Sequence, residues 1–316
     1  EALQEVSVPR GIALAMVVSQ HLIQYIVVGV PGAFLFFSKM GGKIELEQEE
    51  LEKEANEQAL ELVDDASVKI PVTAASCALS IIIPAYNEEA RLGKTINEIE
   101  NYFSEKALDF EVIVVDDGSS DKTAALINEI NKRNPKIKFL TYPRNRGKGY
   151  AVRFGVLNAQ GEQILFADAD GATPIAEYAR LEKEIARGSD IAIGSRAMQS
   201  TDTGVKTVWY RKFIGRIFNS LVNIIVLPGI ADTQCGFKLF KRKVAYHVFS
   251  KQLSEKFSFD VEILFIARKS KYKISEIPVN WVNQPGSKVN LIKDSFAMAV
   301  DLLRFRIRDL FGKYAL

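Results

Sequence analysis

The chain has 316 residues, of which 47% are hydrophobic and 25% are charged, and its formal net charge is +2. This composition is typical of one large globular domain or two small ones, and the near-neutral charge argues against bulk attraction to nucleic acid. Only two cysteines occur, Cys77 and Cys235, so neither a disulfide scaffold nor a cysteine-based zinc site is expected.

An apolar stretch near the N-terminus departs from that globular composition. Residues 11–38 contain no Lys, Arg, Asp or Glu. A helix needs roughly 20 apolar residues to cross a bilayer, whereas the apolar core of a signal peptide has only about 7–15. We therefore predict that residues 1–40 form a membrane anchor, with a buried core helix as the alternative. Lys39 and Lys43 follow the span and weakly favour a cytosolic position for the rest of the chain.

An acidic segment, residues 41–77, comes next. Its leucines and alanines are spaced loosely for a helix, and we interpret it as a solvated connector without chemistry of its own. We expect the globular domain to extend from residue 78 to residue 290.

Strands and helices alternate along this domain. Five short apolar runs are predicted strands, and helical patterns long enough for crossovers separate them. Because the runs are apolar on both faces, they predict an α/β fold of Rossmann-like type, with a mostly parallel sheet covered by helices on both sides. The predicted strands are 79–86, 110–117, 137–143, 163–170 and 190–196.

Polar residues follow four of these strands. Ligands of open parallel sheets bind outside the carboxyl ends of the strands, so these residues are expected to converge on one site. They include Tyr86, Asn87 and Glu88 after the first strand, Asp116 and Asp117 after the second, Asp168 and Asp170 after the fourth, and Arg196 after the fifth.

Asp168 and Asp170 are the candidate metal ligands. Residues two apart on extended chain share a face, so both carboxylates are expected to point the same way. Two such oxygen ligands suit a hard cation, Mg²⁺ or Mn²⁺, which completes its coordination with substrate phosphates. The alternative is a pair of solvated aspartates that cap a helix starting near Pro174. The other polar strand ends favour the metal site.

A basic loop, residues 143–151, places Arg144, Arg146 and Lys148 around two glycines and leads into a helix. Glycines let backbone N–H groups approach an anion, and a helix N-terminus favours negative charge. The spacing of a P-loop is missing. We predict a contact to nucleotide phosphate, and a solvated loop is the alternative.

The C-terminal segment, residues 291–316, is a predicted amphipathic helix with basic residues mostly away from its apolar face. Such a helix can lie in a membrane interface, but packing on the domain core is an equal alternative. The helix 209–227 mixes bases and large apolar residues in a similar way. The apolar face consists of Phe296, Val300, Leu303, Ile307 and Leu310.

Six stretches follow one another as they do in family 2 glycosyltransferases of the GT-A fold: IIIPAYNEE, VIVVDDGSSD, NRGKGYAVRFG, FADADGATP, IGSRA and DTQCGFKLF. The resemblance covers residues 78 to about 311. It is closest to the branch that glucosylates dolichyl phosphate. This implies a UDP-glucose donor, a dolichyl phosphate acceptor and inversion at the sugar. It also implies a single-pass protein of the endoplasmic reticulum membrane with its catalytic domain in the cytosol, and leaves a homo-oligomer open.

The resemblance also implies roles for individual residues. Asp168 and Asp170 would hold Mg²⁺ or Mn²⁺ against the diphosphate; Ala172 stands where the mannose-transferring branch has a further metal-binding Gln. Asp232 would orient the sugar or the acceptor, with a structural role as the alternative. Uridine binding falls to Pro84, Ala85, Tyr86, Asn87, Glu88, Asp116 and Asp117, and phosphate contacts to Arg146 and Lys148.

The acceptor accounts for the remaining arginines. A phosphate monoester has its second pKa near about 6, so it is already a nucleophilic oxyanion at neutral pH and needs no strong general base. It needs positive charge to hold it beside an anionic donor. Arg196 and Arg211 match that need, with Lys212 or Arg216 as additional candidates.

Two other functions stay open at this point. One is a polyprenyl-phosphate glycosyltransferase with a different donor, GDP-mannose or UDP-GlcNAc, or with a bacterial lipid acceptor. The other is a membrane-tethered protein that binds a sugar nucleotide without turnover. A processive polysaccharide synthase is disfavoured, because the sequence has no Gln-x-x-Arg-Trp motif.

Overall fold

The computed structural model describes residues 75–198, 200–206, 209–284 and 291–314, with residues 206, 209–213 and 291–296 described by their backbone only. The predicted membrane anchor, residues 1–40, and nearly all of the acidic connector lie outside these ranges. Within the described ranges, no helix combines the length and apolar character that a membrane crossing requires.

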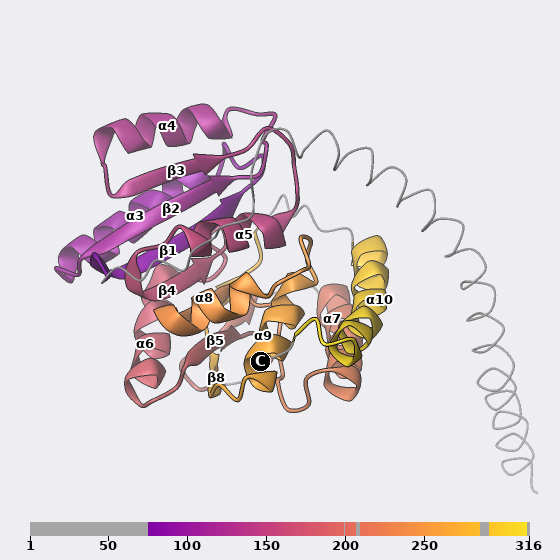
Figure 1. The fold of residues 1–316 in the computed structure, drawn as a ribbon. Coiled ribbons are helices and arrows are strands. Elements are labelled where there is room, and N and C mark those ends of the chain that lie inside the picture. The colour runs from indigo at the N-terminus through magenta and orange to yellow at the C-terminus, as the bar shows by residue number, and fades with distance from the viewer. Residues whose placement is uncertain (1–74, 199, 207–208, 285–290, 315–316) are drawn as a thin grey trace, which may run out of the picture. The chain divides into compact units, whose positions relative to one another are not determined.

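The domain is built on a seven-stranded sheet with the strand order β3-β2-β1-β4-β7-β5-β8 (Figure 1). Four strands are parallel neighbours: β1 (Cys77–Ala85), β2 (Phe110–Asp116), β3 (Ile137–Thr141) and β4 (Gly161–Ala167). Two more, β5 (Ile191–Ser195) and β8 (Ile274–Pro278), pair in parallel with each other. Between these groups lies β7 (Phe237–Lys241), which is antiparallel to both β4 and β5.

The five predicted strands correspond to β1 through β5, and the mostly parallel α/β sheet is confirmed. Two features differ from the prediction. The antiparallel strand β7 separates β4 from β5, which the alternation of strands and helices did not indicate. In addition, β4 ends at Ala167 rather than at Asp170, because the chain turns there and Gly171 has a positive φ of 65°. Asp168 and Asp170 therefore lie on a turn and not on extended chain.

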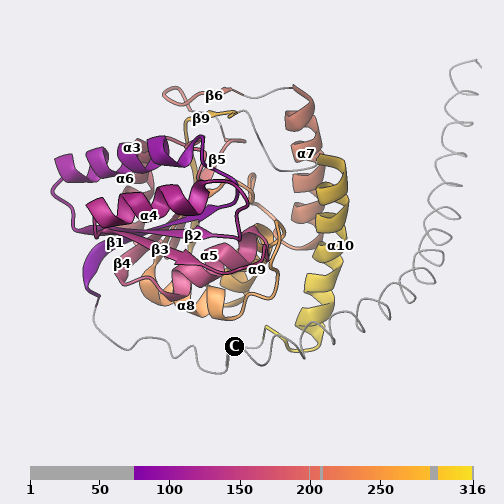
Figure 2. The same cartoon turned by 90° about the horizontal axis from the view of Figure 1, so that it is seen from above.

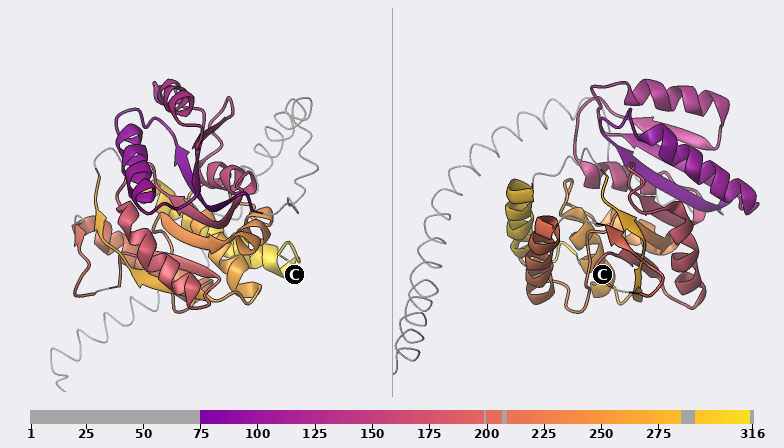
Figure 3. Two further views of the ribbon diagram at one scale, coloured as in Figure 1. Left: turned by 90° about the vertical axis from the view of Figure 1, so that its left-hand side faces the viewer. Right: turned by 180° about the vertical axis from the view of Figure 1, so that it is seen from behind.

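Helices cover both faces of the sheet (Figure 1, Figure 3). Successive strand residues point to opposite faces, so Ile81 and Ile83 of β1 pack in one apolar cluster and Ile82 in the other. The first cluster includes residues of α3 (Leu92–Glu105), α4 (Thr123–Arg133) and α6 (Tyr178–Ala186), the last preceded by the short helix η2 (Ile175–Glu177). The second includes residues of α5 (Lys148–Leu157), α8 (Arg242–Ser250) and α9 (Phe259–Lys269).

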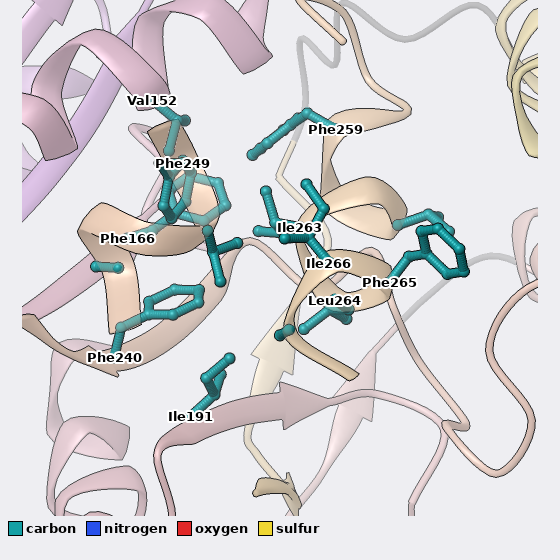
Figure 4. Close-up of a cluster of buried hydrophobic side chains, with 14 of the residues drawn as sticks. Val152, Phe166, Ile191, Phe240, Phe249, Phe259, Ile263, Leu264, Phe265 and Ile266 are labelled. Atoms are coloured by element: carbon teal, nitrogen blue, oxygen red, sulfur yellow. The ribbon is translucent and has the colours of Figure 1, made fainter. Parts of the chain in front are cut away.

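Aromatic side chains join the central strands to α8 and α9 in the second cluster (Figure 4). Phe166 of β4 meets Phe259 of α9 edge to face, with ring centroids 5.7 Å apart. Phe240 of β7 meets Phe249 of α8 at 5.5 Å. All four rings are fully buried, and fully burying a Phe side chain contributes about 1.5–3 kcal/mol. Phe166 lies two residues before Asp168, so its contact with Phe259 fixes the carboxyl end of β4 beneath the site described below.

Two further helices, α7 (Trp209–Ile225) and α10 (Leu291–Leu310), lie side by side against the second cluster (Figure 2). Met298, Leu302 and Phe305 of α10 are buried, so one face of this helix packs on the domain core. Its predicted apolar face is different and exposed: Leu303 and Ile307 are each 52% exposed. One face of the helix thus packs on the core, and the other leaves apolar side chains exposed, as an interfacial helix would. A small parallel pair, β6 (Val205–Lys206) and β9 (Trp281–Val282), completes the fold.

Candidate active site

A cleft of about 1120 Å³ lies at the carboxyl ends of the central strands. Most of the residues that the sequence assigned to a site line this cleft. They are Pro84, Ala85, Tyr86, Glu88, Asp117, Lys148, Asp168, Asp170, Arg196 and Asp232. Asn87, Asp116 and Arg146 do not line it. Arg211 belongs to α7, but its side chain lies outside the described part of the chain, as does that of Lys212.

Asp168 and Asp170 line the cleft from the turn after β4. Burial raises the pKa of Asp170 above its ordinary value, and repulsion from the neighbouring Asp168 carboxylate raises it further. Lys148 Nζ lies 2.7 Å from Asp168 Oδ1 and offsets part of this repulsion. Among the described residues, no group of three or more His, Cys, Asp or Glu side chains forms a metal site. Two converging carboxylates fit a hard cation that takes its other ligands from a substrate and water.

The Asp117 carboxylate holds the basic loop against the end of β2. It accepts hydrogen bonds from the backbone N–H groups of Arg146 and Gly147, at 2.7 and 3.0 Å, and from the Tyr142 hydroxyl at 2.9 Å. Burial raises the pKa of Asp117, and these donors act against that rise. Asp117 therefore orders the loop, and its cleft-facing position leaves it beside any ligand bound there.

The glycines of the loop serve chain packing. A Cβ at Gly147 would lie 2.6 Å from the carbonyl oxygen of Glu255, and one at Gly149 equally close to that of Ser254. The backbone N–H of Tyr150 donates to the same Glu255 carbonyl at 3.0 Å. The backbone donors at residues 146, 147 and 150 are thus paired within the protein. Contact between this loop and nucleotide phosphate stays a prediction.

The two predicted phosphate-binding side chains of the loop diverge. Lys148 lines the cleft beside Asp168. Arg146 instead pairs with Glu255 at 2.5 Å, and its guanidinium lies 3.5 Å from the centroid of the Tyr150 ring. The structure thus places Lys148 in the cleft, whereas Arg146 points toward Glu255.

Asn87 and Asp116 tie together the loops that follow β1 and β2. Asn87, at a positive φ of 54°, accepts from the backbone N–H of Ser120 at 2.8 Å. Asp116 accepts from Ser119 N–H and from the Thr141 hydroxyl, each at 3.2 Å. Both side chains thus order the loops that border the cleft. Their sequence position alone did not reveal this structural contribution.

Arg196, directly after β5, forms a two-pronged ion pair with Asp232, and both residues line the cleft. Arg196 Nε and Nη2 donate to the two carboxylate oxygens at 2.7 and 2.8 Å, and the Arg196 backbone N–H adds a third bond at 2.9 Å. Burial disfavours the charged carboxylate, but Arg196 outweighs it and lowers the pKa of Asp232. Glu276 in turn accepts from the backbone N–H groups of Ala231 and Asp232. Asp232 thus orients Arg196 and is not placed as a free base.

Arg91 and Asp260 are among the charged cleft residues that the sequence analysis missed. Arg91 lines the cleft and donates two hydrogen bonds to the Glu88 carboxylate, one turn earlier. Asp260 also lines the cleft and pairs with Lys238, whose side chain is fully buried. A signal was present in each case: the Glu88–Arg91 spacing favours a pair, and a lysine inside an apolar strand needs a buried partner.

Comparison with protein families gives one match over the catalytic region. The model described as Glycosyl transferase family 2 matches residues 80–249, which is more than half of the chain. The matched region runs from β1 through α8 and contains every cleft residue named so far except Asp260.

Curated relatives extend the similarity beyond that region. A mouse protein named dolichyl-phosphate beta-glucosyltransferase is 36% identical over 97% of this chain and 95% of its own length. Its human namesake is 39% identical over 75% of this chain and 78% of its own length. Two-thirds or more of each relative is thus covered.

Solved structures show the same fold. A crystal structure of glucosyl-3-phosphoglycerate synthase from Mycobacterium tuberculosis with Mn²⁺, UDP and phosphoglyceric acid superposes with a TM-score of 0.52. The match covers 76% of this chain and 80% of that one at 17% identity. At this identity the likeness bears on architecture, and it confirms the predicted α/β fold of GT-A type.

Proposed function

This chain belongs to glycosyltransferase family 2, and we propose that within it the protein transfers glucose from UDP-glucose to dolichyl phosphate. The products would be dolichyl β-D-glucosyl phosphate, a glucose donor for assembly of the N-glycan precursor, and UDP. Relatives that carry this activity in their names, at 36–40% identity, support the assignment. The observation that carries it is the composition of the cleft, which is lined by two carboxylates and by Arg196. Two helices with exposed apolar side chains, α7 and α10, belong to the same domain.

Asp168 and Asp170 would hold Mg²⁺ or Mn²⁺ in this reaction. The mutual repulsion of the two carboxylates, which Lys148 relieves only in part, fits a divalent cation between them. When bound, the cation would supply Lewis-acid stabilisation of the charge on the departing UDP. Lys148 would add positive charge at the same diphosphate. Pro84 to Glu88 and Asp117 would surround the uridine.

The acceptor phosphate would lie on the side of the cleft formed by Arg196. Because the phosphate is itself an oxyanion, the reaction needs no side chain to remove a proton from it. The pairing of Asp232 with Arg196 is consistent with this, since it leaves a guanidinium and no free base at that wall. We propose that Arg196, Arg211 and Arg216 hold the phosphate for in-line attack on C1 of glucose; Arg216 lines the cleft.

The exposed faces of α7 and α10 would contact the bilayer that contains the lipid acceptor. Ile224 on α7 is 79% exposed, and Leu310 and Phe311 at the end of α10 are 86% and 79% exposed. Large exposed apolar side chains on two helices in contact favour an interaction surface. We place the protein at the endoplasmic reticulum membrane, with residues 1–40 as a single-pass anchor and the catalytic domain in the cytosol.

Charges placed on this apolar face are expected to impair transfer to membrane-embedded acceptor. Leu303→Asp combined with Ile307→Asp should lower the efficiency with long-chain polyprenyl phosphate in vesicles roughly 10- to 150-fold. Each half-exposed side chain loses about half of the 1.5–3 kcal/mol that full burial contributes. Transfer to a short, water-soluble polyprenyl phosphate should not change. The matched control adds the same charges to α3, through Asn97→Asp and Asn101→Asp, both exposed. Equal losses with both acceptors would contradict a bilayer contact.

Lys148 and Arg146 of the basic loop are expected to differ in importance for the donor. Lys148→Met should lower kcat/KM for UDP-glucose by about 10- to 150-fold, the effect of one charge-assisted contact worth 1.5–3 kcal/mol. Arg146→Ala should change it less than about threefold, since an exposed ion pair contributes little. Initial rates at saturating acceptor give both values. Losses of similar size would return Arg146 to the donor site.

Product analysis tests the proposed function directly. The full chain is incubated with radiolabelled UDP-glucose and dolichyl phosphate, and the lipid extract is analysed for a β-linked glucosyl phosphate. Labelled GDP-mannose and UDP-GlcNAc serve as donor controls. Transfer from one of these instead of UDP-glucose would assign another donor. Binding of UDP-glucose without any lipid product would indicate a sugar-nucleotide-binding protein.

A further inference from the structure

Asp168 and Gly236 lie opposite each other, directly after the end of β4 and directly before the start of β7. The antiparallel register runs to Ala167 opposite Phe237. One position further, the Asp168 backbone N–H donates to the Gly236 carbonyl oxygen at 3.0 Å. The first aspartate of the metal-binding pair is therefore positioned by a strand from a distant part of the chain.

The Asp168 carboxylate occupies the space in which a side chain at position 236 would lie. A Cβ built on Gly236 would have all three carboxylate atoms inside 3.0 Å, a separation that real Cβ atoms essentially never show. The described glycines with a positive φ do not include Gly236. Its backbone is thus one that other residues can adopt, and the need for glycine here comes from space alone.

Lys148 contacts the same carboxylate. Its Nζ lies 2.7 Å from Asp168 Oδ1 and 5.3 Å from the centroid of the Phe166 ring, which is itself buried. A larger residue at 236 would therefore push the carboxylate away from its present position, and the contact with Lys148 would change with it.

We propose that Gly236 is a positioning residue for the metal-ligating carboxylate of Asp168, an inference that rests on the metal site of the proposed function. A hard cation such as Mg²⁺ requires ligand oxygens in near-ideal positions. A methyl group at 236 would displace the carboxylate by about 1 Å, and misplacement on this scale is enough to cost two orders of magnitude in rate.

Mn²⁺ binding is the first test. The full-length protein is titrated with Mn²⁺ in the presence of UDP, and free Mn²⁺ is followed by electron paramagnetic resonance. We expect Gly236→Ala to bind about 10- to 100-fold more weakly than wild type, the range found when a residue that orients a metal ligand is changed. Gly204→Ala is the matched control, because a Cβ there would meet no atom within 4 Å. Wild-type affinity in Gly236→Ala would overturn the proposal.

A stability cycle supplies the second test and uses neither metal nor substrate. Gly236→Ala should lower the melting temperature of the wild-type chain but not that of Asp168→Ala, in which the new methyl group fills vacated space. Equal losses in both backgrounds would place the clash elsewhere and overturn the proposal, even if the single variant folds poorly. A wild-type chain that binds Mn²⁺ but transfers no glucose would count against the proposed function and not against the role of Gly236.

Discussion

Replacing Asp170 with Asn is expected to abolish glucose transfer while leaving the fold intact. A neutral amide is a poor ligand for a hard dication, so the variant loses charge stabilisation at the departing UDP. The loss of several kcal/mol corresponds to a decrease of at least about 10³-fold in kcat. Transfer from UDP-glucose under saturating Mg²⁺ or Mn²⁺ gives the measurement.

Stability should not decrease in this variant. Asp170 Oδ1 accepts the backbone N–H of Ala172 at 3.0 Å, a bond that an amide oxygen also accepts. The substitution also removes one of two carboxylates that repel each other. The melting temperature of the variant should therefore equal or exceed that of wild type. Asp109→Asn, at an exposed position, controls for the change in net charge. An active Asp170→Asn enzyme, or wild-type activity in EDTA, would remove the metal from the mechanism.

Arg196→Ala is expected to impair both acceptor use and stability. If the guanidinium holds the lipid phosphate, losing a charge-assisted contact of about 1.5–3 kcal/mol should lower acceptor efficiency roughly 10- to 150-fold. Arg196→Lys should restore only part of this, since an ammonium cannot make the planar two-pronged contact. The same variant leaves the buried Asp232 carboxylate without its partner, which should cost about 2–4 kcal/mol of folding free energy.

A double variant separates these two effects. Combining Arg196→Ala with Asp232→Ala removes the uncompensated charge, so it should recover stability but not acceptor efficiency. UDP-glucose affinity, measured by calorimetry without acceptor, should change little throughout. Loss of donor affinity with an unchanged acceptor KM would assign Arg196 to the leaving group. Arg211→Ala provides a parallel test. If it loses UDP-glucose affinity while the acceptor KM is unchanged, the lipid phosphate is held by Arg216 or Lys212 in its place.

The order of strands and helices follows from local pattern alone. Runs such as 79–86 and 110–117 are apolar on both faces, which only a sheet covered on both sides can bury. Since parallel strands share one carboxyl edge, the same pattern brought Asp168, Asp170, Lys148 and Arg196 to one cleft. The roles attached to these residues came from the resemblance to a family, because periodicity reports burial and carries no information on substrates.

Contacts between segments far apart in the chain were decided only by the tertiary structure. Local pattern did not indicate that β7 inserts between β4 and β5, so the slot that Gly236 leaves for Asp168 was hidden. The same holds for the partner of Arg196, which is Asp232. The loop glycines likewise appeared open to an anion, whereas the 254–256 segment fills the space beside them. The physical reason is that periodicity reports which face of a segment is buried, but not which distant segment covers it.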